Sequence, residues 1–137
     1  MFLHTRLKVR DLDRAITFYS SHLGLTLRDR KTSPRGTQLA FMHCPGSPTE
    51  LELAFLPWDV DFKLDEDIFH LAFSVRDMAG TVEKMRAGGV KITEEPGPDG
   101  HMAFIEDPDG YEIELLEYDP GEYEALMRKA DEAAGVH

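Results

Sequence analysis

The chain has 137 residues, of which 42% are hydrophobic and 30% charged, with a formal net charge of −11 and a single cysteine, Cys44. This length suits one globular domain with its own core, and the acidic balance argues against nucleic acid or a membrane surface as partner. No stretch reaches the roughly 20 apolar residues of a membrane-spanning helix. Because the N-terminus also lacks a secretory signal and one cysteine cannot form an internal disulfide, we expect a cytoplasmic protein.

Hydrophobic periodicity divides the chain into a regular series of elements. A strand begins at about His4, and a helix follows that Asp11 caps and Gly24 ends. After an acidic linker over 57–67, a second strand begins at His70 and leads to another short helix. The remaining elements are strands at about 25–31, 37–43, 50–56, 90–95, 101–106 and 111–118, a tight turn at 107–110, and an amphipathic C-terminal helix at about 120–134.

An internal repeat explains this series. HTRLKVRDL at 4–12 is echoed by HLAFSVRDM at 70–78, and ELEL at 50–53 is echoed by EIEL at 112–115. The echoes occur in the same order and at nearly equal spacing, which indicates one βαβββ unit written twice. We therefore predict an α+β fold: a single domain over 1–137, with two βαβββ modules at about 1–57 and 67–119. The two modules are expected to form a curved, open barrel-like sheet, followed by the C-terminal helix.

Four residues at equivalent places in the two copies form a candidate metal site. Because side chains alternate along a strand, His4, Glu52, His70 and Glu114 each lie on the face opposite an apolar row. Two imidazoles and two carboxylates are competent ligands for one divalent cation, and nickel, zinc, cobalt, manganese or ferrous iron would suit them. A lone strand histidine is usually structural, so the duplication carries this prediction. Glu50 and Glu112 share the same parity and remain alternatives.

At these residues the chain resembles the vicinal oxygen chelate superfamily, and specifically bacterial glyoxalase I, also called lactoylglutathione lyase. The resemblance extends to about Tyr118. It rests on the segments LHT at 3–5, AITFY at 15–19, LGL at 23–25, EL at 52–53, HLAFSV at 70–75 and FIEDPDGY with IEL at 104–115. It implies that the four candidate residues are the metal ligands of a lyase of methylglyoxal detoxification.

The resemblance also implies a reaction and a substrate. The methylglyoxal–glutathione hemithioacetal would become S-lactoylglutathione by metal-assisted proton transfer through an enediolate, with Glu114 as the main base and Glu52 on the opposite face. Lys8 matches a glutathione-contacting arginine of the family. Arg6 lies on the same strand face, so Lys8 and Arg6 are the predicted substrate-binding residues. The family resemblance further implies a homodimer.

Two other classes of function stay open at this point. A related metalloenzyme, either an epimerase or an extradiol-type dioxygenase, would reuse the same ligands on a different substrate. A non-enzymatic binding protein of the bleomycin-resistance type would keep the fold without the metal. An asparagine that is common in glyoxalase I enzymes is replaced here by Leu56, and a basic residue that some of them carry is replaced by Glu66. Both replacements weaken the case for glutathione as part of the substrate.

Overall fold

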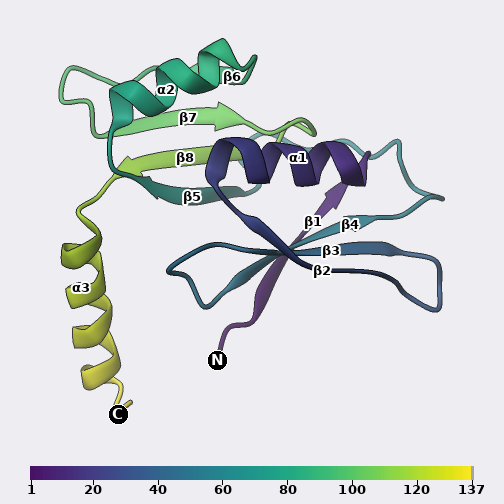
Figure 1. Cartoon of the computed structure of the whole chain (residues 1–137), viewed down its shortest axis with the longest axis horizontal. Helices are drawn as coiled ribbons and strands as arrows, with labels where there is room; N and C mark the ends of the chain where they lie inside the picture. The colour runs from purple at the N-terminus through teal and green to yellow at the C-terminus, as the bar shows by residue number, and fades with distance from the viewer. Residues whose placement is uncertain (137) are drawn as a thin grey trace. The chain divides into compact units, whose positions relative to one another are not determined.

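The computed structural model describes residues 1–136, in which one order of helices and strands occurs twice (Figure 1). The first copy contains β1 (His4–Val9), α1 (Leu12–Leu23), β2 (Thr26–Thr32), β3 (Gln38–His43) and β4 (Glu50–Phe55). The second contains β5 (His70–Val75), α2 (Met78–Ala87), β6 (Lys91–Glu94), β7 (Met102–Glu106) and β8 (Glu112–Glu117), and α3 (Pro120–Ala133) follows. The predicted α+β class, with two βαβββ modules and a C-terminal helix, is confirmed.

Each copy builds its own four-stranded sheet, with strand orders β1-β4-β3-β2 and β5-β8-β7-β6. The first and last strands of each copy pair in parallel, whereas the other neighbours are antiparallel. A parallel pair needs a long crossover connection, which the helix and the two intervening strands supply. Residues far apart in the sequence, from the start and the end of one module, therefore lie side by side.

The helix α1 covers one face of the first sheet and fixes which strand residues are buried (Figure 1). Its N-cap is Asp11, whose side chain accepts a hydrogen bond from the Arg14 backbone N–H at 3.0 Å. Gly24 ends it at a φ of 72°, a left-handed conformation that glycine adopts without strain. On the adjoining strand Leu7 and Val9 are buried, and the alternate residues face away, as the parity argument predicted.

The helix α2 packs in the same way on the second sheet, where it contacts β6 and β8. Its buried residues are Met78, Val82 and Met85, and Ile113 and Leu115 of β8 are buried in the same unit. The Asp77 side chain caps the helix by accepting a hydrogen bond from the Gly80 backbone N–H at 3.0 Å. A short amphipathic helix of this kind is stabilised mainly by burying its apolar face rather than by its own propensity.

The C-terminal helix α3 extends from the end of β8 (Figure 1). Asp119 caps it, as its side chain accepts from the Gly121 backbone N–H at 2.8 Å. The apolar stripe of this amphipathic helix is largely in solvent, since Tyr123, Leu126 and Met127 are 47%, 54% and 40% exposed. Such a stripe can pack on its own domain or on a partner, and either contact stays a prediction.

The described chain divides into two compact units, one of Met1–Phe69 with Asp107–Tyr111 and the other of His70–Glu106 with the residues from Glu112 onward. The turn at Asp107–Tyr111 thus belongs to the first unit although β7 and β8 flank it. The buried Asp107 carboxylate accepts hydrogen bonds from the Tyr19 hydroxyl at 2.7 Å and from the Tyr111 N–H at 2.9 Å. Burial raises the pKa of both Asp107 and the Tyr19 hydroxyl above their ordinary values.

We predict that Tyr19→Phe destabilises the protein by about 2 kcal/mol at neutral pH, because it removes a donor from a buried carboxylate. The free energy of unfolding from chemical denaturation measures this change. Tyr123→Phe, at an exposed position on α3, is the matched control and should leave the stability unchanged.

The pH dependence of this loss has a defined sign. The Tyr19 hydroxyl favours ionised Asp107, so its removal raises the folded-state pKa of Asp107 further, and the variant binds the proton first as the pH falls. The stability difference between wild type and Tyr19→Phe should therefore shrink as the pH falls from about 7 toward 4, through the two folded-state pKa values of Asp107, which both lie above the ordinary value for aspartate. An equal difference at both pH values would contradict this account.

Candidate metal centre

His4 and Glu52 form the first of two matched pairs. The His4 Nε2 lies 3.0 Å from the Glu52 Oε2, with the histidine 42% exposed and the glutamate side chain only 4% exposed. Their strands β1 and β4 are parallel neighbours, which brings two residues from opposite ends of the module together. A carboxylate this deeply buried needs a positive or hydrogen-bonding partner to offset its lost hydration. We call His4 and Glu52 the first pair.

His70 and Glu114 form the second pair in the other unit. The His70 Nε2 lies 3.1 Å from the Glu114 Oε2, across the parallel neighbours β5 and β8. Here the glutamate is more accessible, with its side chain 18% exposed, and His70 is 46% exposed. The repeat in the sequence is therefore matched by a repeat in geometry, and each module contributes one imidazole and one carboxylate.

A phenylalanine completes each pair and was missed by the sequence analysis. Phe41 on β3 is in register with Glu52, and Phe104 on β7 is in register with Glu114. The ring of His4 meets Phe41 edge-on at 5.9 Å, and that of His70 meets Phe104 at 5.6 Å. Such contacts restrict the orientation of the imidazole. In the sequence, Phe41 precedes Glu52 by nearly the same distance as Phe104 precedes Glu114, and this repeated spacing could have identified the two phenylalanines.

The alternative ligand Glu50 is engaged elsewhere. Its carboxylate binds the Arg28 guanidinium, whose Nη2 lies 2.8 Å from Oε1. This guanidinium also holds the pKa of Glu50 below its usual range. Although Glu50 is the backbone partner of His4 in the sheet, the His4 side chain contacts Glu52. The structure thus favours Glu52 over Glu50 as the partner of His4.

The donor atoms of each pair fit a divalent ion. Two donors at neighbouring positions of an octahedral ion, with bonds of about 2.1 Å, lie about 3.0 Å apart. Both observed separations are close to this value. Within residues 1–136, no group of three or more histidine, cysteine or acidic side chains is arranged so that it could hold a metal ion. The four predicted ligands thus occur as two pairs, and their joint action on one ion stays a prediction.

The two predicted substrate-binding cations already have partners in the first unit. Arg6 donates to both oxygens of Glu52, from Nε at 3.2 Å and from Nη2 at 3.1 Å. Lys8 binds the Asp59 carboxylate of the linker, and its Nζ also lies 5.0 Å from the centre of the Phe62 ring. Sequence analysis did not anticipate Asp59, and contact of either cation with a substrate stays a prediction.

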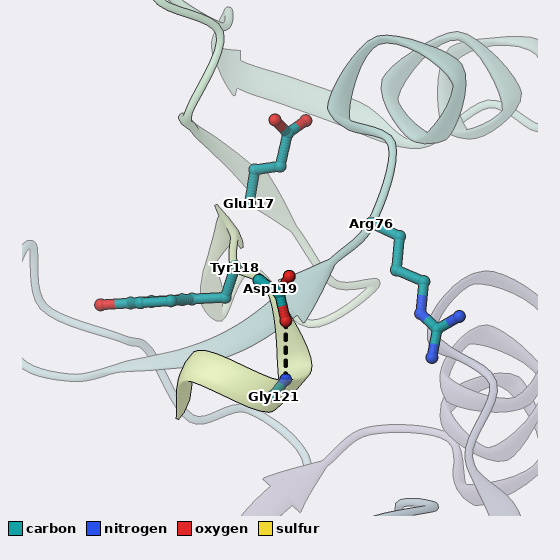
Figure 2. A pocket seen from close by; sticks show the side chains of 5 residues that line it. All are labelled: Arg76, Glu117, Tyr118, Asp119 and Gly121. Carbon is teal, nitrogen blue, oxygen red and sulfur yellow. Dashed lines mark hydrogen bonds between the residues drawn. The ribbon is translucent and has the colours of Figure 1, made fainter. Parts of the chain in front are cut away.

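An open hollow of about 590 Å³ lies in the second unit, near the ends of β5 and β8. Figure 2 shows its lining of Arg76, Glu117, Tyr118, Asp119 and Gly121, with the Glu117 carboxylate and the Arg76 guanidinium pointing in different directions. Glu117 accepts a hydrogen bond from the Met78 backbone N–H at 2.9 Å, and Asp119 caps α3. Both acids serve helix ends, and none of the predicted ligands lines the hollow.

Comparison with known proteins agrees with this fold. The family model of the Glyoxalase/Bleomycin resistance protein/Dioxygenase superfamily matches residues 2–115. The chain belongs to this superfamily. A probable lactoylglutathione lyase of Synechocystis is 40% identical over 125 residues, covering 84% of this chain and 93% of the relative. The lactoylglutathione lyase of Escherichia coli O157:H7 is 42% identical over 124 residues, covering 84% and 90%.

A solved structure gives the same result over almost the whole chain. The trypanothione-dependent glyoxalase I of Leishmania major is 34% identical and superposes with a TM-score of 0.80, covering 98% of this chain and 97% of that one. The superfamily resemblance predicted from the sequence is confirmed. In the part of the chain that the structure describes, no helix has the length and apolar character to cross a membrane.

We predict that Glu52→Gln abolishes high-affinity binding of a divalent ion, because it removes the buried carboxylate that faces His4. Glu50→Gln is the matched control, two residues away on the same strand and bound to Arg28, and should bind the ion as the wild type does. Isothermal titration of the metal-free protein with zinc measures both. Loss of binding in Glu50→Gln with retention in Glu52→Gln would reverse the assignment.

Proposed function

We propose that this chain is a lactoylglutathione lyase, an enzyme of the glyoxalase I type that converts the hemithioacetal of methylglyoxal and glutathione into S-lactoylglutathione. The observation that carries the proposal is the 40% and 42% identity to two lactoylglutathione lyases over 84% of this chain. The duplicated His–Glu pairs support it independently of those names. Together they favour a glyoxalase over an epimerase, a dioxygenase or a metal-free drug-binding protein.

His4, Glu52, His70 and Glu114 would hold one divalent ion, with nickel, zinc, cobalt, manganese and ferrous iron all compatible with two imidazoles and two carboxylates. When bound, the ion supplies positive charge that makes a C–H bond beside a chelated oxygen more acidic. Glu114 takes the proton from one carbon and returns it to the neighbouring carbon. Its greater exposure, 18% against 4% for Glu52, leaves it more room to move between these positions.

Cations near the first pair could bind an anionic substrate. The Arg28 guanidinium carbon and the Lys31 Nζ each lie 5.2 Å from the centre of the Phe41 ring, and Lys8 lies on the same strand as His4. Arg28 and Lys8 already pair with Glu50 and Asp59, so a carboxylate of glutathione would compete with these two acids for them.

The assembly and location of the enzyme belong to the same proposal. As in the family resemblance, the chain would form a homodimer in the cytoplasm, and the two His–Glu pairs at one ion would come from one chain or from two. The exposed apolar stripe of α3, around Leu126, is available for a contact with a partner. A single domain over the whole chain remains part of this proposal.

We predict that the metal-loaded protein consumes the adduct formed from methylglyoxal and glutathione, followed by the absorbance of the thioester product. Glu114→Gln should lower kcat by about a hundredfold or more, because it removes the proposed base. Glu112→Gln, on the same strand face, is the control and should retain the wild-type kcat, because the His70 side chain pairs with Glu114 although Glu112 is its backbone partner.

Two outcomes would contradict the proposal at different levels. Wild-type protein that binds the ion but leaves the adduct unchanged would refute the lyase activity. Equal kcat in Glu114→Gln and wild type would refute Glu114 as the base while leaving the activity itself intact.

A further inference from the structure

The two His–Glu pairs match closely, yet one neighbouring residue differs. The backbone partner of Glu52 on the parallel strand is Arg6, whereas the corresponding partner of Glu114 is Ala72. The His–Glu distances, 3.0 and 3.1 Å, and the edge-on phenylalanine contacts are otherwise the same in both pairs. Arg6 is therefore the main chemical difference between the two carboxylates.

Arg6 holds Glu52 through a fork of two hydrogen bonds. Its Nε lies 3.2 Å from Oε2 and its Nη2 lies 3.1 Å from Oε1, so each oxygen receives a donor. The Arg6 side chain is half-exposed, at 53%, whereas the Glu52 side chain that it binds is buried. A bidentate guanidinium fixes the plane of a carboxylate as well as neutralising its charge, which a lysine could not do.

The geometry allows this fork to persist beside an ion. The Oε2 atom of Glu52 lies near both the Arg6 Nε and the His4 Nε2. One of its lone pairs can therefore accept the hydrogen bond from arginine while another points toward the histidine. A ligand oxygen that already accepts a hydrogen bond from a cation has less electron density to give to a metal or a proton. Glu114, by contrast, has His70 as its ion-pair partner and no arginine beside it on β5.

We propose that Arg6 is a positioning residue that holds Glu52 as a fixed and weakly basic ligand, so that Glu114 is the carboxylate free to move the proton. The inference rests on the proposed function and deepens it, since it gives a physical reason for unequal roles of two otherwise equivalent glutamates. It also means that Arg6 acts through Glu52 rather than by binding the substrate.

The test uses Arg6→Met, which keeps the length of the side chain and removes both its charge and its fork. Competition against a chromophoric chelator gives the affinity for zinc alone. We expect Arg6→Met to bind zinc about tenfold more tightly, because a cation competing for Glu52 is gone. Arg28→Met is the matched control, because it removes an arginine of the same sheet that binds Glu50 rather than Glu52. This change should alter the affinity for zinc by less than about twofold.

A second measurement follows the metal-free protein. Without its fork the buried Glu52 loses a partner, so Arg6→Met should lower the melting temperature by roughly 3–5 °C. In a Glu52→Gln background the same substitution should have no further effect, because its target is absent. Arg6→Lys should keep an affinity for zinc close to wild type, since the charge remains.

Kinetics on the metal-loaded enzyme separate this role from substrate binding. Arg6→Met should leave KM for the methylglyoxal–glutathione adduct within about twofold of wild type. A tenfold rise in KM with unchanged zinc affinity would overturn the inference and make Arg6 a substrate contact. Unchanged zinc affinity together with an unchanged melting temperature would also overturn it. Neither the zinc titration nor the melting curve needs a substrate. These two measurements can therefore refute the role of Arg6 while the lyase activity is confirmed, or support that role while the lyase activity is refuted.

Discussion

The parallel pairing of the first and last strands of each module is the constraint on which the rest of the structure depends. It brings His4 beside Glu52 and His70 beside Glu114 from opposite ends of each module. The antiparallel strand on the other side then adds a phenylalanine in register with each glutamate. Because the opposite face of each sheet is occupied by a helix and the apolar core, polar ligands can gather only on this face.

Duplication of the module supplies two similar pairs, and in the proposed reaction their carboxylates have different roles. We infer that Arg6 makes them differ, because it lies beside Glu52 at a position where the other copy has Ala72. Burial also restricts the movement of Glu52, whose side chain is less exposed than that of Glu114. In the proposed mechanism, environment rather than residue type would separate a fixed ligand, Glu52, from a mobile base, Glu114.

Alternation and repetition made much of this predictable from the sequence. The repeated VRD and ELEL-type phrases gave the two modules, and the parity of the strands placed each histidine and glutamate on the face away from the helices. The fork of Arg6 was not predictable, because parity says only that a side chain shares a face and not which neighbour it binds. The turn at Asp107–Tyr111 was predicted as a turn, but its contact with Tyr19 depends on long-range packing that no local pattern contains.

We propose that the two pairs bind a single ion. X-ray absorption at the zinc edge of the loaded protein is the decisive measurement, since it counts the imidazoles bound to each ion. We expect a shell of nitrogen and oxygen donors with two imidazoles per zinc, falling to one in His70→Ala. A wild-type spectrum with one imidazole per zinc, together with two zinc ions per chain, would show that each pair binds its own ion and would refute the shared site.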